Sequence, residues 1–323
     1  MTNINESKII NLKNKIKEAL TPLIDSDYAL LDVPDHENIG DNLIWEGELH
    51  FLNEISFKNK YEASIFFFEQ KKIPKDAIII FHGGGNFGDI YKKTNQERLK
   101  IIAENHDKKI IIFPQTIFYQ DYKNLIEDAK IINAHPNLTL CVRDHTSLKI
   151  AEEHFPNITT LLLPDMAFCI DLSIFKSSEK ANKTLFMKRR DSELNERTPQ
   201  ITGDYDSLDW PTFNMPKEER WKKIAIQRRL DKVAKFLQSI PIVSLLVDSR
   251  YGIKSRKGRE KYIQTGIEFF NQYETIYTTR LHGLILGVLM GKDMKVLDNS
   301  YGKLSDFYDA WLKDFEKVER IDY

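Results

Sequence analysis

The sequence predicts an α/β protein built from two open, parallel β-sheets. Short, strongly apolar segments alternate with helical patterns along the chain, and the alternation starts again after a polar stretch near the middle. Strands that alternate with helices usually form parallel sheets covered on both faces. At 323 residues the chain is also long enough for two domains.

In the first half, five apolar segments bounded by turn residues are typical of buried strands. They are residues 28–33, 77–81, 109–113, 138–142 and 159–163. An amphipathic helix precedes them, and helical patterns separate them at residues 42–53, 97–105, 122–133 and 145–154. We expect right-handed crossovers between these strands.

The polar segment 171–183 marks the predicted boundary between the two halves. Strands are predicted after it at 184–187, 242–247, 275–278 and 295–297, and helices at 221–238, 255–270, 280–290 and 303–317. Residues 194–216 are polar and interrupted by prolines, which favours a surface loop. The predicted domains are residues 1–176 and 177–302, with a C-terminal helix in 303–323 that packs back on the first domain. Two Rossmann-like domains would then face each other across a cleft.

Composition argues against several classes of protein. Lys and Arg number 47 and Asp and Glu 48, so the chain lacks the basic excess of nucleic-acid-binding proteins. No apolar run approaches the roughly 20 residues that cross a bilayer. The two cysteines, Cys141 and Cys169, lie in apolar segments, as expected of a cytoplasmic protein with reduced thiols. No group of His, Cys, Asp and Glu has metal-ligand spacing, so we expect no metal.

The most informative segment is Tyr277–Gly283, where a predicted strand runs directly into a helix. Thr279 suits the N-cap, which places Arg280 and His282 in the first helical turn. Two cations there oppose the helix dipole unless an anion is bound. A phosphate would satisfy the free amides and the guanidinium together. Alternatively, Arg280 pairs with an acidic neighbour and His282 has a structural role.

A glycine-rich segment follows the strand predicted at 77–81. Four glycines in six residues, 83–88, permit close approach of backbone amides to a ligand. Gly84, Gly85 and Asn86 are therefore candidate cleft residues. The spacing matches neither the dinucleotide-binding nor the Walker pattern, and a tight turn is the alternative.

Polar residues follow four other predicted strands. Asn38, Gly40 and Asp41 follow the first strand and either line the cleft, with Asp41 a candidate base, or cap the next helix. Arg143 and Asp165 follow two later strands, and helix-start roles near them are equally plausible. In the second half, Lys188, Arg189 and Arg190 form either a positive wall of the cleft or surface ion pairs with nearby acids.

Taken in order, these blocks resemble the polysaccharide pyruvyl transferase family. The blocks span residues 38 to about 300 and are Asn38-x-Gly40-Asp41, Gly83-Gly84-Gly85-x-x-Gly88-Asp89, Val142-Arg143-Asp144 with Ser147, Leu163-Pro164-Asp165, Arg189-x-Asp191-x-Glu193 and Arg280-Leu281-His282-Gly283. The resemblance implies a GT-B-like fold, with the acceptor on the first domain and the donor on the second. It implies phosphoenolpyruvate as the donor, held by Arg280, Leu281, His282 and Arg189, and no cofactor.

The implied acceptor is a sugar of an exopolysaccharide, a capsule or a cell-wall precursor, and the implied product is a cyclic ketal. Phosphoenolpyruvate carries close to three negative charges, which Arg280, Arg189 and His282 would offset. A protonated His282 would serve as acid, and Asp41 or Asp165 would accept a hydroxyl proton. A lipid-linked acceptor would place the enzyme near the inner face of a membrane. The alternatives are a nucleotide-sugar glycosyltransferase of the GT-B type and a non-catalytic sugar- or anion-binding protein; the sequence does not indicate an oligomeric state.

Overall fold

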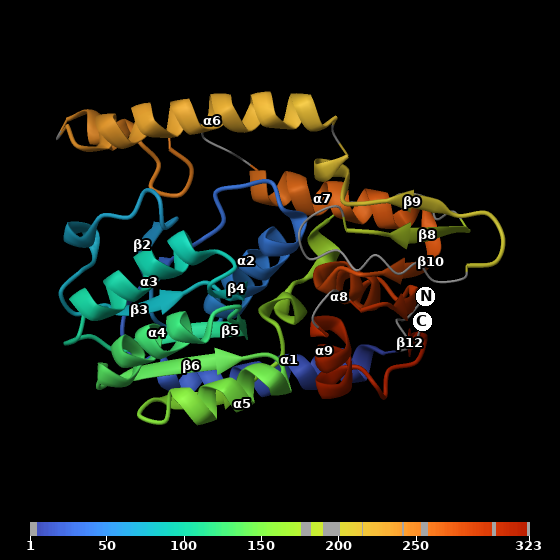
Figure 1. Ribbon diagram of the computed structural model, residues 1–323, viewed down its shortest axis with the longest axis horizontal. Helices are drawn as coiled ribbons and strands as arrows, with labels where there is room; N and C mark the ends of the chain where they lie inside the picture. Colours follow the sequence, from blue (N-terminus) through green and yellow to red (C-terminus); the bar gives the residue numbers. More distant parts are fainter. Residues whose placement is uncertain are drawn as a thin grey trace.

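Two parallel β-sheets, each packed against helices, make up the computed structural model in Figure 1. The structure describes residues 5–175, 182–189, 201–214, 216–240, 242–252, 258–298 and 302–321. The predicted α/β class with parallel sheets is confirmed.

The first sheet has the strand order β2-β1-β3-β5-β6-β7, and β4 pairs with β5. Its strands are β1 (Tyr28–Leu31), β2 (Asn59–Ala63), β3 (Ile78–Phe81), β4 (Gly84–Gly88), β5 (Ile110–Phe118), β6 (Leu138–Val142) and β7 (Thr159–Leu162). All pairings are parallel. The sequence did not predict β2 and β4. Strand β2 lies at the sheet edge and buries only Tyr61 and Ala63 of its five residues, and β4 is made of the glycine-rich segment itself.

Helices cover both faces of this sheet. They are α1 (Glu6–Leu20), α2 (Ile39–Leu52), α3 (Lys92–Glu104), α4 (Tyr122–Ala134) and α5 (His145–His154). Alternate residues of a strand point to opposite faces: Ile79 and Phe81 belong to the core that includes residues of α3, α4 and α5, whereas Ile78 and Ile80 pack with residues of α1 and α2. Burial on both faces explains why this strand is apolar throughout.

The second sheet has the order β12-β11-β10-β8-β9, again with parallel pairings. Its strands are β8 (Lys183–Met187), β9 (Asp206–Leu208), β10 (Tyr273–Thr278), β11 (Asp293–Val296) and β12 (Val318–Arg320). The helices of this half are α6 (Lys217–Gln238), α7 (Gly258–Asn271), α8 (Leu281–Leu289) and α9 (Lys303–Trp311). Short 3-10 turns occupy Thr21–Leu23, Gln70–Lys72, Met166–Cys169, Leu172–Ile174, Pro211–Phe213 and Val243–Leu246.

Three predictions for the second half were wrong. The strand expected at 242–247 is the 3-10 turn Val243–Leu246, because β9 occupies the place beside β8. Segment 194–216 is not wholly a surface loop, because residues 201–214 contain β9 and the buried Asp209 and Trp210. Residues 194–200 and 215 lie outside the described ranges. The last helix ends at Trp311, and β12 follows it.

The two halves pack directly on each other. One hydrophobic cluster joins Ile39 and Phe168 of the first half to Met187 and Leu284 of the second. The indole Nε1 of Trp311 also donates to the carbonyl oxygen of Arg143 at 2.8 Å. These contacts bring the carboxyl ends of β6 and β7 close to the start of α8.

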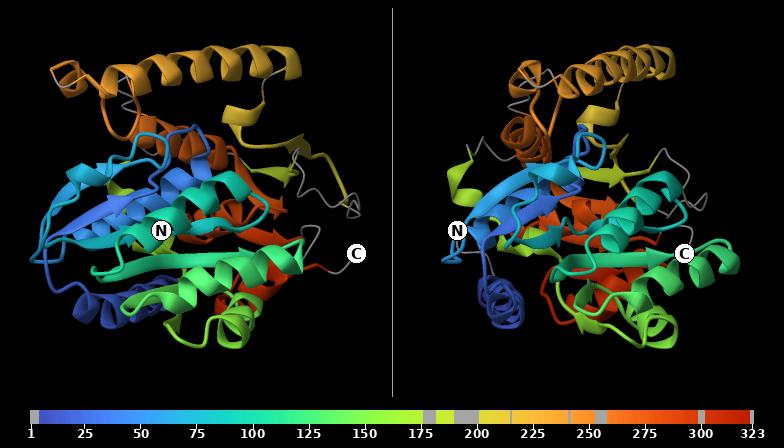
Figure 2. Two further views of the ribbon diagram at one scale, coloured as in Figure 1. Left: turned by 60° about the vertical axis from the view of Figure 1, so that its left-hand side comes forward. Right: turned by 90° about the vertical axis from the view of Figure 1, so that its left-hand side faces the viewer.

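Helix α6 runs along the outside of the molecule in every view of Figures 1 and 2. Across the described ranges, no helix has both the length and the apolar character needed to span a membrane.

Candidate functional site

Three charged or polar side chains converge at the carboxyl ends of the strands. Arg143 follows β6, Asp165 follows β7, and His282 lies in the first turn of α8 after β10. Arg143 Nη1 donates to Asp165 Oδ2, and His282 Nε2 lies 3.4 Å from the same oxygen. Arg143 Nη1 is also 3.4 Å from His282 Nε2. The structure thus brings together candidate residues from both halves of the chain.

Hydrogen bonds to neighbouring residues hold Asp165 and Arg143 in place. Asp165 is the N-cap of the 3-10 turn Met166–Cys169, and its Oδ1 accepts from the amide of Ala167 at 2.8 Å. Arg143 Nε donates to Thr116 Oγ1 at 3.0 Å. Within the described ranges, the buried Arg143 Nη2 has no hydrogen-bond partner. A fully buried guanidinium nitrogen with an unused donor is suited to an anionic ligand.

The electrostatics of the cluster favour an ionised Asp165 and a neutral His282. Burial acts to raise the pKa of Asp165, but the charge of Arg143 and the hydrogen bond to His282 outweigh it, so this pKa is well below its usual range. Burial lowers the pKa of His282; the Asp165 carboxylate opposes this shift and the Arg143 charge adds to it. The imidazole is therefore neutral near pH 7 in the structure as it stands.

Gly40 lies against the imidazole of His282. A Cβ at residue 40 would lie 2.6 Å from His282 Nδ1, closer than real Cβ contacts. Asn38 caps α2, since its Oδ1 accepts from the Gly40 amide at 3.0 Å, and its Nδ2 donates to Asp41 Oδ2 at 2.7 Å. Asn38 therefore has the helix-capping role that was one of its two sequence-based alternatives. The negative charge of Asp41 also acts on His282, so these residues belong to the same site.

Arg280 makes a buried pair with Asp209. The Arg280 Nε and Nη2 atoms donate to the two carboxylate oxygens, with Nη2 and Oδ2 2.7 Å apart. The guanidinium carbon lies 5.0 Å from the ring centroid of Phe213. An acidic neighbour for Arg280 was one of the two sequence-based alternatives, but the sequence did not identify Asp209, because it lies in a short polar segment. Leu281 is buried in the hydrophobic cluster that joins the two halves.

The end of β8 is tied to the start of α8. The backbone amide of Arg189 donates to Thr279 Oγ1 at 3.2 Å, and Arg189 is 8% exposed. This places the backbone of Arg189 next to the residue that precedes Arg280. The choice between Arg189 and Arg190, and the predicted Asp191 and Glu193, involve residues outside the described ranges.

Comparison with known proteins then decides the family. Residues 38–301 match the sequence profile described as polysaccharide pyruvyl transferase. The chain belongs to this family. Arg143, Asp165 and His282 all lie within the matched region.

Relatives with assigned names agree with this result. EpsO of Bacillus subtilis, named as a candidate pyruvyl transferase, is 30% identical over 95% of this chain and 94% of its own length. Pyruvyl transferase 1 of Schizosaccharomyces pombe is 30% identical over 88% of this chain and 69% of its own length. These relationships support a transferase activity. A crystal structure of a functionally uncharacterised protein from Klebsiella pneumoniae shares the fold, with a TM-score of 0.63 and 21% identity over 97% of this chain and 99% of that one.

The glycine-rich segment of this family member is held in place by a hydrogen bond to a buried, charged side chain. Asn86 Oδ1 accepts from Arg98 Nη2 at 2.6 Å, and the same nitrogen donates to Asp32 Oδ2 at 2.5 Å. Asp32, which pairs with Arg98, follows β1 and has a positive φ of 65°. Gly84 begins β4 with a φ of 135°, which favours glycine there.

A second buried pair supports this segment. Glu48 of α2 accepts from the Gly83 amide through Oε1 and lies 2.8 Å from His82 Nδ1 through Oε2. Burial raises the pKa of Glu48 more than His82 lowers it. Burial alone would lower the pKa of His82, but the charge of Glu48 and its hydrogen bond outweigh burial. The pKa of His82 is therefore raised. Glu48 and Arg98 were not predicted from the sequence. Charged residues at core positions of amphipathic helices are the signal that could have identified them.

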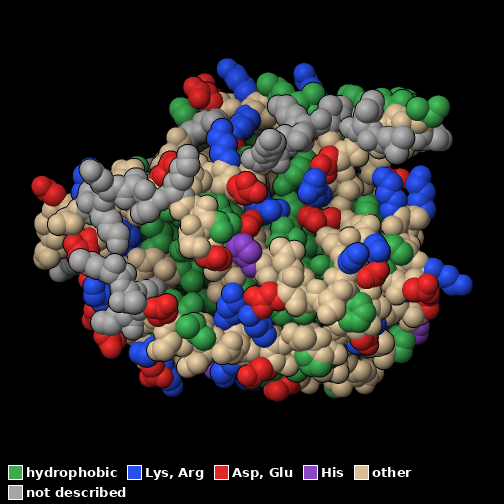
Figure 3. Space-filling model, turned by 180° about the vertical axis from the view of Figure 1, so that it is seen from behind, with side chains coloured by type: hydrophobic (Ala, Val, Ile, Leu, Met, Phe, Trp, Pro, Cys, Tyr) green, Lys and Arg blue, Asp and Glu red, His purple; other side chains and the backbone are tan. Residues whose placement is uncertain are grey.

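Charged side chains of both signs are interspersed with histidine near the centre of the face seen in Figure 3, with hydrophobic side chains visible between them. This distribution contrasts with the single-sign patches of proteins that bind large polyanions.

Proposed function

We propose that the protein transfers a pyruvyl group from phosphoenolpyruvate to two hydroxyl groups of a sugar, forming a cyclic ketal and releasing inorganic phosphate. The cluster of Arg143, Asp165 and His282 at the strand ends, within a chain of this family, is the observation that carries the proposal. We place the donor at the start of α8 and the acceptor over the first half, in a cleft of the GT-B type. The sugar would belong to an exopolysaccharide, a capsule or a cell-wall precursor.

The charges at the site suit an anionic donor. Within the part of the chain that the structure describes, the buried Nη2 of Arg143 has no hydrogen-bond partner. His282 stands at the N-terminus of α8, where backbone amides favour an anion. Asp209 orients the guanidinium of Arg280 at the same helix start. Hydrogen bonds to charged groups contribute roughly 1.5–3 kcal/mol each. Two or three of them are enough for a donor site of micromolar affinity.

In the proposed reaction the methylene carbon of phosphoenolpyruvate gains a proton and one sugar hydroxyl adds to the central carbon. The second hydroxyl then displaces phosphate from that carbon. The two hydroxyl groups release two protons: one balances the proton on carbon, and the other leaves with phosphate. A phosphate beside His282 would raise its pKa toward working pH and allow it to act as the acid.

Asp165 and Asp41 would have different roles. The lowered pKa of Asp165 makes it a poor proton acceptor, so it would orient the imidazole and stabilise its charged form. Asp41 remains the candidate base for a sugar hydroxyl, because its charge acts on the same imidazole. The lowered pKa of Asp165 thus assigns different roles to two carboxylates that the sequence could not distinguish.

Thermal unfolding with added ligands tests the donor. Phosphoenolpyruvate at about a hundredfold its Kd should stabilise the folded state by roughly 2.7 kcal/mol, and this effect should be lost in His282→Asn. His106→Asn is the matched control, because His106 precedes β5 and so lies at the amino ends of the strands, opposite the site. Stabilisation by UDP or GDP but not by phosphoenolpyruvate would indicate a glycosyltransferase instead.

A further inference from the structure

Helix α6 carries an unusual concentration of positive charge. Residues 217–238 contain eight Lys and Arg but three Asp and Glu, a net charge of +5 in a chain whose total is −1. Between Trp221 and Phe236 the one acidic residue is Asp231, whose carboxylate accepts from Gln227. The basic character of α6 is therefore a local feature, opposite in sign to the rest of the protein.

One stripe of α6 alternates cations with hydrophobic residues. Lys222, Ile226, Arg229, Val233 and Phe236 recur every three or four residues, which places them on one face of a helix. We call this set the outer stripe. All five residues are exposed, and Ile226, Val233 and Phe236 are 58%, 50% and 67% accessible. Ile242, just beyond the helix, is 83% accessible.

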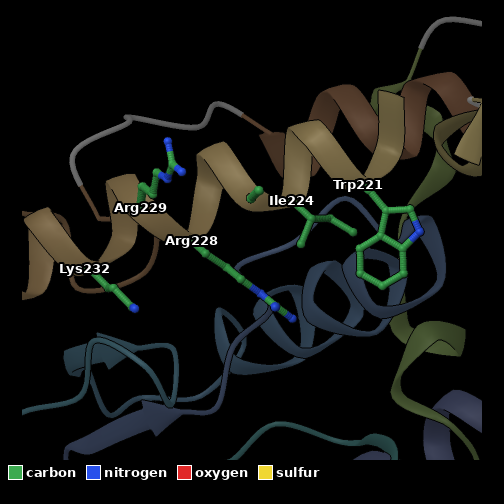
Figure 4. Close-up of a pocket in the computed structure, with 6 residues that line it drawn as sticks. Trp221, Ile224, Arg228, Arg229 and Lys232 are labelled. Atoms are coloured by element: carbon green, nitrogen blue, oxygen red, sulfur yellow. The ribbon is translucent and has the colours of Figure 1, made fainter. Parts of the chain in front are cut away.

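Other faces of α6 hold the helix to the protein. Ala234 is buried, Gln238 Nε2 donates to the Phe67 carbonyl oxygen at 2.6 Å, and Lys223 pairs with Glu37. In Figure 4 the side chains of Arg228 and Lys232 point to one side of α6, whereas that of Arg229 in the outer stripe points to the other. The contacts that hold α6 to the protein thus come from residues outside the outer stripe.

The charge of the outer stripe decides between possible partners. A second copy of the chain packed stripe to stripe would place Lys222 and Arg229 against the same cations. Neither residue has an acidic partner within the described parts of the chain. An anionic lipid surface offers phosphate groups for the cations and an acyl boundary for the hydrophobic side chains.

We propose that the outer stripe of α6 docks the protein on an anionic membrane surface. Helices that lie in the interface combine exposed apolar side chains with Lys and Arg, and their binding depends on both. This inference rests on α6 alone and does not depend on the reaction proposed above.

Co-sedimentation of the full-length chain with vesicles tests the proposal. We expect binding to vesicles of phosphatidylcholine with phosphatidylglycerol, little binding to phosphatidylcholine alone, and release at about 1 M salt, where the Debye length falls to roughly 3 Å. Equal binding to both vesicle types, or none to either, would overturn the proposal.

Variants at exposed positions locate the contact. Lys222→Gln with Arg229→Gln should weaken binding roughly thirtyfold, since each cation near such a surface contributes about 1 kcal/mol. Ile226→Ser with Phe236→Ser should also weaken it. The matched controls are Lys93→Gln with Lys149→Gln and Tyr122→Ser, all exposed sites on other helices.

If both double variants of the outer stripe bind the vesicles as wild type does, the assignment to α6 is refuted. Sedimentation velocity tests the competing partner: a dimer that Ile226→Ser with Phe236→Ser dissociates would show that a second copy covers the stripe, and would likewise overturn the proposal.

Discussion

Asp165→Asn removes the negative charge from the buried cluster that joins the two halves. Asp165 and Arg143 are both 0% exposed, so the variant leaves a buried guanidinium without its counter-charge. Breaking a buried pair in this way costs about 3–5 kcal/mol. With about 2.1 cal/mol/K of unfolding entropy per residue, a cooperative unit of 323 residues should lose roughly 4–7 °C in Tm.

Differential scanning calorimetry at pH 7 measures this loss, with Asp76→Asn as the matched control. Asp76 is exposed, and substitutions at such surface sites usually stay within about 0.5 kcal/mol. A double variant, Arg143→Met with Asp165→Leu, should recover most of the stability, because an apolar pair of similar volume leaves no buried charge. An Asp165→Asn protein with the Tm of the control would refute the structural role assigned to this pair.

The same pair predicts a pH dependence. The folded-state pKa of Asp165 is lowered from its ordinary 3.8, so its contribution to stability is complete above that pH and is lost as the pH falls toward the folded-state pKa. The stability difference between wild type and Asp165→Asn should therefore be constant from pH 5 to 7 and shrink below about pH 4. Urea unfolding across this range measures it, and a difference that grows as the pH falls would contradict the assignment.

Three further changes test other parts of the site. Gly40→Ala should displace the site imidazole and lower kcat sharply while the fold persists, as steady-state kinetics and circular dichroism would show; full activity would mean that the imidazole position is not critical. Asp209→Asn should release the orientation of Arg280 and raise KM for the donor more than Asp76→Asn does, and an unchanged KM would count against a donor role. His82→Asn should lower the free energy of unfolding most below pH 6.5, because the protonated ring stabilises the pair with Glu48. The loss should become smaller as the pH rises through the raised folded-state pKa of His82. Chemical unfolding at several pH values measures this loss, and the opposite trend would be contrary evidence.

The sequence predicted the central strands of the first sheet because they are buried on both faces and largely apolar. It missed β2, whose edge position exposes polar residues, and β9, whose three residues are too few to show a pattern. It also assigned a strand to residues 242–247, because an apolar run alone cannot show whether a place in a sheet is available.

For the site, the sequence identified residues at strand ends but not the contacts among them. Arg143 and His282 are 139 residues apart, and their contact follows from how the two halves pack, which no local pattern encodes. Asp209 and Glu48 were missed for related reasons: each is an ordinary acidic residue in sequence, and only burial beside Arg280 or His82 gives it a role.

Transfer of label from phosphoenolpyruvate to a sugar tests the central claim most directly. The pyruvyl carbons would carry the label, and candidate acceptor sugars would be screened with wild type, His282→Asn and the control His106→Asn. We expect labelled ketal and inorganic phosphate in equal amounts with wild type and the control, and neither with His282→Asn. Phosphate release without labelled sugar, or undiminished transfer by His282→Asn, would contradict it.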